Sequence, residues 1–80
     1  SGQTLEDSTL VDLLGHLMNA MDDLDFNTST TIIESIEEYN LSDKEKEVFS
    51  KIKDCVEDLD PENIETYAME WMELRTGTSQ

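Results

Sequence analysis

Leucine and methionine recur at steps of three and four residues near the start of the chain, the spacing that places side chains on one face of an α-helix. We therefore expect a first helix from about Leu5 to Asp23 and, from a second stripe, another from about Phe26 to Tyr39. β-Branched residues at 30–32 lower the helix propensity of the second. The expected inward stripes are Leu10, Leu13, Leu14, Leu17, Met21 and Leu24, then Ser29, Ile32, Ile33, Ile36 and Tyr39.

Two further helices have start signals in their sequence. Ser42 followed three residues later by Glu45 is the capping-box pattern, in which each residue's side chain binds the other's backbone N–H. Asp60-Pro61 combines an N-cap residue with proline at the first helical position. Residues 76–80 are expected to form a disordered tail. The expected inward stripes are Val48, Phe49, Ile52, Val56 and Leu59, then Ile64, Tyr67, Ala68, Trp71 and Leu74.

The chain also repeats itself after 35 residues, which places Asp-Leu-Asp at 23–25 and again at 58–60. Each copy reads as a helix, an acidic corner and a second helix. One hairpin cannot bury its own apolar stripe, so we expect two hairpins, at about 5–39 and 43–74, to share one core. The sequence thus predicts an all-α, four-helix domain of two tandem antiparallel hairpins, with residues 1–80 as a single domain.

Charge narrows the range of functions. The 80 residues carry 20 Asp and Glu against 5 Lys and Arg, a formal net charge of −15. Such a chain is repelled by nucleic acids and by anionic membrane surfaces. Residues 1–43 contain ten acids and no Lys or Arg, so the first hairpin suits a basic protein surface. Cys55 has no second cysteine to pair with, which favours a cytoplasmic location.

Candidate binding residues come from this acidic surface and from methionines beside the predicted core stripes. We expect a protein partner and no direct contact with nucleic acid or membrane, and we expect no cofactor and no enzyme active site. The sequence does not set the oligomeric state. The candidates are Asp12, Met18, Asp22, Asp23, Asp25, Glu37, Glu38 and Met72.

The run from Leu17 to Phe26, followed by Ile32 to Ile36, resembles the acidic helical C-terminal tails of bacterial hybrid histidine kinases and response regulators. Those tails follow a receiver domain and are similar to histidine-containing phosphotransfer (HPt) domains. The resemblance implies a regulatory module of two-component signalling that binds a receiver domain. An active HPt domain presents its histidine in a His-x-x-Lys-Gly setting. Here His16 is followed by Leu-Met-Asn-Ala, so the resemblance implies a degenerate member, with phosphotransfer through His16 as an alternative.

Two other functions stay open from the sequence. Asp23, Asp25, Asn27, Ser29 and Glu34 stand at positions 1, 3, 5, 7 and 12 of a loop of EF-hand length, which is the pattern of a calcium-binding hairpin. Thr28 occupies the sixth position, where the turn requires glycine. The other alternative is an acidic mimic that blocks the nucleic-acid site of a basic protein. Four lysines between residues 44 and 53 oppose it, because they make the third helix mixed in charge.

Overall fold

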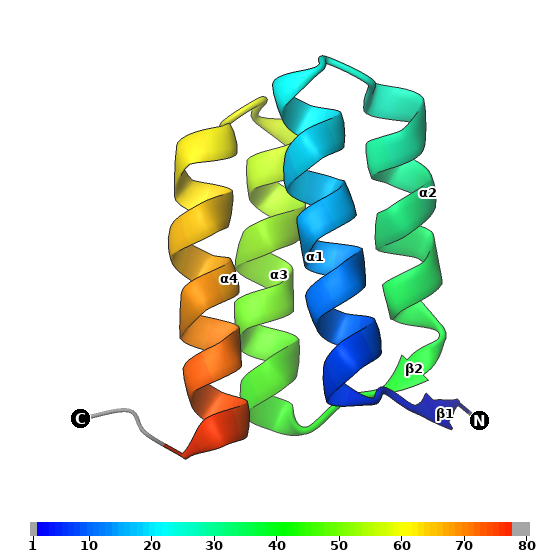
Figure 1. Ribbon diagram of the computed structural model, residues 1–80, viewed down its shortest axis with the longest axis vertical. Coiled ribbons are helices and arrows are strands. Elements are labelled where there is room, and N and C mark those ends of the chain that lie inside the picture. Colours follow the sequence, from blue (N-terminus) through cyan, green and yellow to red (C-terminus); the bar gives the residue numbers. More distant parts are fainter. Residues whose placement is uncertain (1, 78–80) are drawn as a thin grey trace. The chain divides into compact units, whose positions relative to one another are not determined.

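Four α-helices and one pair of two-residue strands make up the computed structural model, which describes residues 2–77 (Figure 1). The chain divides between Leu41 and Ser42 into two units, and each unit is an antiparallel helical hairpin. This confirms the predicted all-α fold of four helices in two tandem hairpins. The helices are α1 (Asp7–Asp22), α2 (Phe26–Glu37), α3 (Asp43–Glu57) and α4 (Pro61–Thr76), and the strands are β1 (Gln3–Thr4) and β2 (Tyr39–Asn40).

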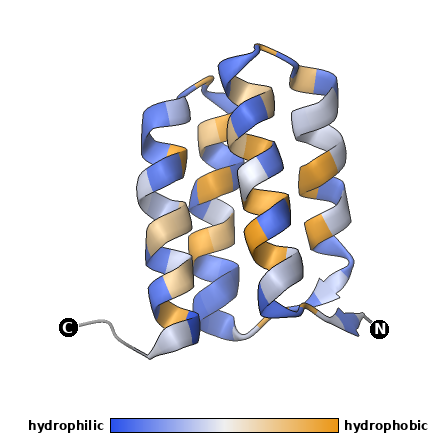
Figure 2. Ribbon diagram, viewed as in Figure 1, coloured by the Kyte–Doolittle hydropathy of each residue, from blue (hydrophilic) through white to orange (hydrophobic). Residues whose placement is uncertain are grey.

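In the first hairpin, α1 and α2 bury most, but not all, of the residues in the stripes that the helical spacing predicts. Hydrophobic positions alternate with hydrophilic ones along both helices (Figure 2). Ser29 is the one polar residue of the hairpin that is fully buried among those described, and its hydroxyl donates to the Asp25 carbonyl at 3.0 Å. A buried hydroxyl with a hydrogen-bond partner avoids the desolvation penalty. The buried residues are Leu10, Leu14, Leu17, Ala20 and Met21 on α1, and Ser29, Ile32, Ile33 and Ile36 on α2.

A short parallel strand pair joins the two ends of the first hairpin, and the helical spacing did not predict it. Gln3 pairs with Tyr39 and Thr4 with Asn40, and the Asn40 side-chain amide donates to the Gly2 carbonyl at 3.0 Å. Leu5, which follows β1, is buried. The predicted helix from Leu5 therefore begins two residues later, and Tyr39 leaves the helix for β2. A pattern of two residues is too short for periodicity to register.

In the second hairpin, both sequence start signals form the predicted caps. The Ser42 side chain accepts from the Glu45 N–H at 3.2 Å, and the Glu45 carboxylate accepts from the Ser42 N–H at 3.0 Å. Pro61 opens α4 behind the N-cap Asp60. At the other end, Thr76 is helical and Gly77 follows with φ 72°, so the disorder expected from residue 76 is not present at Thr76. Residues 78–80 lie outside the described part of the chain.

The two Asp-Leu-Asp corners adopt the same backbone turn, as the 35-residue repeat predicts. In the first, the Asp25 N–H donates to the Ala20 carbonyl at 2.8 Å and the Leu24 N–H to the Met21 carbonyl at 3.1 Å. In the second, Asp60 and Leu59 make the matching bonds at 2.9 and 3.3 Å. This pair of bonds defines a Schellman motif, which satisfies the last carbonyls of a helix.

The corners also correct the predicted core. Leu24 and Leu59 were expected to face inward, but they are 70% and 57% exposed. Both have a left-handed backbone, with φ of 58° and 56°. Since α1 ends at Asp22 and α3 at Glu57, the three- and four-residue spacing no longer applies there. Five other stripe residues are half-buried rather than buried: Leu13, Tyr39, Val56, Tyr67 and Leu74.

Candidate protein-binding surface

The outward side of α1 carries a strip of side chains that the first hairpin does not bury. Asp12, His16 and Asn19 follow one another at steps of four and three, so they share one line along the helix, and all three are exposed. Val11, Gly15 and Met18 form the neighbouring line, in which Val11 is 51% exposed and Met18 is half-buried. We call these six residues the α1 surface.

Gly15 lies in the middle of this surface, where glycine weakens the helix. Relative to alanine, an interior helix glycine costs about 1 kcal/mol. A Cβ added at Gly15 would meet no heavy atom within 4 Å. Packing among the described residues therefore does not require glycine at this position, and the backbone is open to close approach by another molecule.

The first Asp-Leu-Asp corner holds three of the predicted binding residues, Asp22, Asp23 and Asp25, and all three are exposed. Asp25 is also the N-cap of α2. Its carboxylate accepts from the Thr28 hydroxyl at 2.7 Å and from the Thr28 N–H at 3.1 Å. The hydroxyl bond, and after it the backbone bond, lowers the pKa of Asp25 below its usual 3.8. The carboxylates of Asp22 and Asp23 are the more accessible pair for a partner.

The remaining predicted binding residues lie elsewhere. Glu37 and Glu38 are exposed at the far end of α2, which is about 18 Å from the corner along a helix of this length. They line a hollow of about 630 Å³ together with Gly2, Gln3, Ser35, Tyr39 and Asn40. Met72 is half-buried on α4 in the second hairpin. Seven of the eight predicted residues lie in the first hairpin, and the structure does not gather these seven into one patch. It separates these seven into the α1 surface, the corner and the far end of α2.

His16 is exposed in the α1 surface, as a phosphoacceptor would have to be. Asp12 lies one turn before it, and residues 1–43 provide no lysine or arginine on the same hairpin. A phosphoryl group on His16 would therefore find no neutralising cation within its own hairpin. This arrangement suits contact with a basic surface better than acceptance of a phosphoryl group.

The calcium hypothesis does not fit the local geometry. Helix α2 begins at Phe26, so residues 23–34 do not form an EF-hand loop. The Thr31 hydroxyl donates to the Asn27 carbonyl at 3.0 Å within this helix. Asp23, Asp25 and Glu34 are not drawn together, and residues 2–77 contain no cluster of three His, Cys, Asp or Glu side chains able to hold a metal ion.

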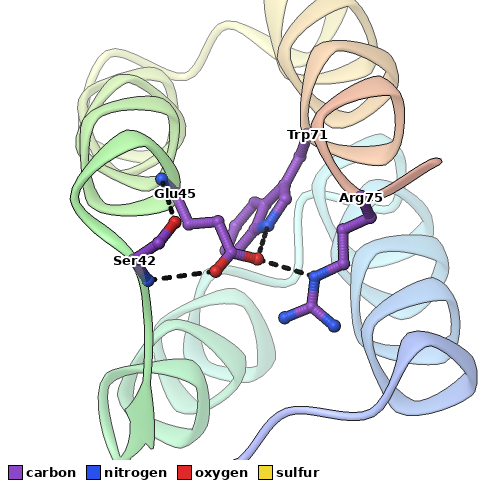
Figure 3. Close-up of polar contacts among 4 residues, drawn as sticks. All are labelled: Ser42, Glu45, Trp71 and Arg75. Atoms are coloured by element: carbon purple, nitrogen blue, oxygen red, sulfur yellow. Dashed lines mark hydrogen bonds and ion pairs between the residues drawn. The ribbon is translucent and has the colours of Figure 1, made fainter. Parts of the chain in front are cut away.

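A polar cluster in the second hairpin was not foreseen from the sequence (Figure 3). The Glu45 carboxylate, besides completing the capping box, accepts from the Trp71 indole N–H at 2.9 Å and from the Arg75 Nε at 2.6 Å. Trp71 is fully buried and packs against Phe49 with ring centroids 5.8 Å apart. Burial alone would raise the pKa of Glu45, but the bonds from Trp71, Ser42 and Arg75 and the charge of Arg75 outweigh it and lower that pKa.

The contacts in this cluster span 26 and 30 residues, so no local pattern signals them. The capping-box pattern predicts the bond from Glu45 to the start of α3, but not its bonds to Trp71 and Arg75. Figure 3 shows the carboxylate held between the start of α3 and the end of α4. Its partners Ser42, Trp71 and Arg75 are all within the hairpin, so the cluster closes the open end of this unit rather than presenting a free reactive group.

Cys55 behaves as the small core residue that the repeat predicts. It aligns with Ala20, and both side chains are 6% exposed. Burial, followed by the nearby charges of Asp60, Asp54 and Asp58, raises the pKa of the thiol above its usual 9.0. A raised thiol pKa disfavours the thiolate and hence a nucleophilic role.

No family model, curated protein or solved structure matches the chain. Within residues 2–77, no helix has the length and apolar character needed to cross a bilayer.

Proposed function

We propose that this chain is a non-catalytic protein-binding module that regulates a bacterial two-component signalling protein, similar to an HPt domain without its phosphotransfer chemistry. The α1 surface is the observation that carries this proposal. On this surface the exposed Val11, the accessible backbone at Gly15 and the acidic Asp12 occur together on an element with no basic residue.

Charge defines the kind of partner. The first hairpin lacks Lys and Arg up to residue 43, so its carboxylates attract a basic protein surface and repel an acidic one. Complementary charge speeds encounter and sets the orientation of docking more than it adds affinity. The association is therefore expected to be fast and sensitive to salt.

Apolar contact supplies the remaining part of the binding energy. Val11 is half exposed, and Gly15 leaves room for a partner side chain or helix to lie directly on the α1 backbone. Met18 beside them is a flexible, polarisable side chain that adapts to a partner's shape. The resemblance to the helical tails of signalling proteins favours a receiver domain as that partner.

The titratable groups of the described residues support a role without catalysis. Catalytic groups have perturbed pKa values in a cleft, where the perturbation serves the reaction. Here the shifted groups are Asp25, Glu45 and Cys55. Each shift has a local structural cause: a helix cap, an enclosed ion pair and a buried thiol.

Affinity measurements with charge-reversal variants test the proposal. The probe is a panel of purified bacterial receiver domains, each free and activated with beryllofluoride. The variant Asp12→Lys/Gly15→Lys places two positive charges in the α1 surface, and lysine at residue 15 also improves helix propensity. The matched control is Glu65→Lys/Met69→Lys, which makes the same charge change at exposed positions of α4.

We expect at least one receiver domain to bind, and the α1 variant to weaken that binding about tenfold, the loss of about one anchoring contact. The control should change the affinity less than about threefold, through net charge alone. Equal weakening by both variants, or no binding by any receiver domain, would contradict the proposal.

Phosphorylation separates this proposal from active phosphotransfer. The chain is incubated with a receiver domain that carries a radiolabelled phosphoryl group. We expect the label to stay on the receiver domain or to appear as free phosphate. Label on the chain that disappears in His16→Gln would instead identify a working phosphotransfer domain.

A further inference from the structure

The two corners of the chain place leucine where the backbone favours glycine. Leu24 and Leu59 occupy the C′ position of their Schellman motifs with φ of 58° and 56°. The left-handed conformation brings a Cβ close to the following carbonyl oxygen, which is why glycine is usual at this position. Both copies of the repeat therefore keep a leucine at a cost in backbone strain.

Core packing does not account for these leucines. Their side chains are 70% and 57% exposed, and they are among the five large hydrophobic residues that stand out on the surface of the described chain. A second exposed apolar residue follows two positions later in each copy. It is Phe26 in the first corner, 38% exposed, and Pro61 in the second. We call residues 22–26 and 57–61 the leucine corners.

Acidic residues flank each exposed leucine in the sequence. Asp22, Asp23 and Asp25 flank Leu24, and Glu57, Asp58 and Asp60 flank Leu59. Neither corner contains a basic residue, so a ligand that covers the leucine must bring positive charge to the rim. An exposed apolar side chain with several acidic neighbours fits a basic segment that carries an apolar side chain.

We propose that the two leucine corners are equivalent docking points, each for a basic protein segment whose apolar side chain packs on Leu24 or on Leu59. The chain then offers two sites for one class of ligand. This inference rests on the proposed protein-binding function, and it adds a contact point and a stoichiometry that the α1 surface alone does not provide.

The left-handed backbone makes a clean test available. Leu24→Gly and Leu59→Gly remove the apolar side chain, keep every charge and place at each corner the residue that its backbone favours. Loss of binding in these variants is therefore not a consequence of unfolding. Met69→Ala is the control, because Met69 is 62% exposed on α4 and lies outside both corners.

Two synthetic peptides of equal charge serve as probes. One has six lysines and six leucines in an amphipathic helical order, and the other has serine in place of every leucine. Titration calorimetry gives the stoichiometry and the affinity, and amide NMR shifts locate the contact. The serine peptide measures the purely electrostatic part of the binding.

We expect the wild-type chain to bind two equivalents of the leucine peptide, about tenfold more tightly than the serine peptide. Each single variant should lose one equivalent, and the double variant should bind both peptides alike. Met69→Ala should behave as the wild type, and the shifts should centre on residues 24 and 59.

An unchanged preference for the leucine peptide in the double variant would overturn the proposal, as would a single equivalent in the wild-type chain. These outcomes leave the proposed function intact, because the receiver-domain test depends on residues 12 and 15. Conversely, failure of the receiver-domain test leaves two peptide sites as a separate result.

Discussion

The Glu45 side chain makes two sets of hydrogen bonds that stabilise the second hairpin. It completes the capping box with Ser42, and it is the acceptor for the buried Trp71 indole and for Arg75. A buried indole N–H without an acceptor would incur its desolvation penalty, so the Glu45 carboxylate allows Trp71 to be fully buried. The hydrogen bonds formed by an ionised carboxylate are stronger than neutral ones.

Removal of this charge should destabilise the second hairpin. For Glu45→Gln we expect the free energy of unfolding to fall by about 1–3 kcal/mol, because charge-assisted bonds become neutral ones. Urea denaturation followed by the fluorescence of Trp71, the single tryptophan, measures it. Glu47→Gln, at an exposed position of the same helix, should change the free energy by less than about 0.5 kcal/mol. A loss that is equal in the two variants would contradict the role assigned to Glu45.

The same carboxylate predicts how stability depends on pH. The pKa of Glu45 is lower in the folded chain than its usual 4.5, so the unfolded chain takes up the proton first as pH falls. The stabilisation is therefore complete above about pH 5 and is lost as pH falls through the folded pKa. Asp25, whose pKa is also lowered, acts in the same direction. The free energy of unfolding, measured by denaturation between pH 3 and 7, should fall less steeply with decreasing pH in Glu45→Gln than in the wild type. An identical pH dependence in the two proteins would refute this assignment.

At the two leucine corners, we expect substitution to stabilise the fold rather than to destabilise it. Leu24→Gly and Leu59→Gly should each raise the free energy of unfolding by about 1 kcal/mol, because glycine removes the left-handed strain at exposed positions. Thermal denaturation followed by circular dichroism measures the change. The contrasting control is Met69→Gly in the middle of α4, for which the free energy of unfolding should fall by about 1 kcal/mol. Destabilisation in the corner variants would show that the leucines contribute more to packing than their exposure implies.

At the scale of elements, helix starts follow side-chain signals and are the best predicted part of the fold. The capping box places the start of α3, and Asp60-Pro61 places the start of α4. The 35-residue repeat aligns Asp25 with Asp60, and in the structure both residues cap their helices. Each cap side chain accepts from the N–H three residues later, and this bond forms within one turn, so sequence alone can specify it.

Substitution of these two caps should have matching effects. Asp25→Ala and Asp60→Ala should each lower the free energy of unfolding by about 1 kcal/mol, since each removes the acceptor for the N–H three residues on. Asp25→Asn and Asp60→Asn retain a hydrogen-bond acceptor, so their free energy of unfolding should fall by much less. Chemical denaturation of the four variants measures the difference. A large loss in the Asn variants would mean that the charge, rather than the cap, is the important property.

Features that depend on distant residues were not predictable. The β1–β2 pair joins residues 36 positions apart, and the Glu45–Trp71–Arg75 cluster spans 26 and 30. No periodicity connects such positions. The spacing of the corner leucines continues the helical stripe and so predicts a core position, and only the left-handed backbone turns them outward. The predicted binding residues share a charge, but helix length separates Glu37 and Glu38 from the corner acids.

For the whole molecule, charge is the property that the sequence establishes most directly. A net charge of −15 on 80 residues disfavours ordinary binding to nucleic acid, and the absence of Lys and Arg before residue 44 makes the first hairpin the more acidic of the two. The structure adds where, on that hairpin, an acidic side chain lies beside accessible backbone and exposed apolar groups. That combination, at Asp12, Gly15 and Val11, is the basis for the proposed function.

The most direct test is an amide NMR titration of the isotope-labelled chain with a receiver domain that binds it, at low and at high salt. The account predicts shifts centred on residues 11–19 that shrink as salt rises from 0.05 to about 0.5 M, since surface charge is screened over that range. It also predicts that Asp12→Lys/Gly15→Lys removes these shifts. Salt-independent shifts confined to residues 43–77 would contradict it, because the partner would then bind the second hairpin without the acidic surface of the first.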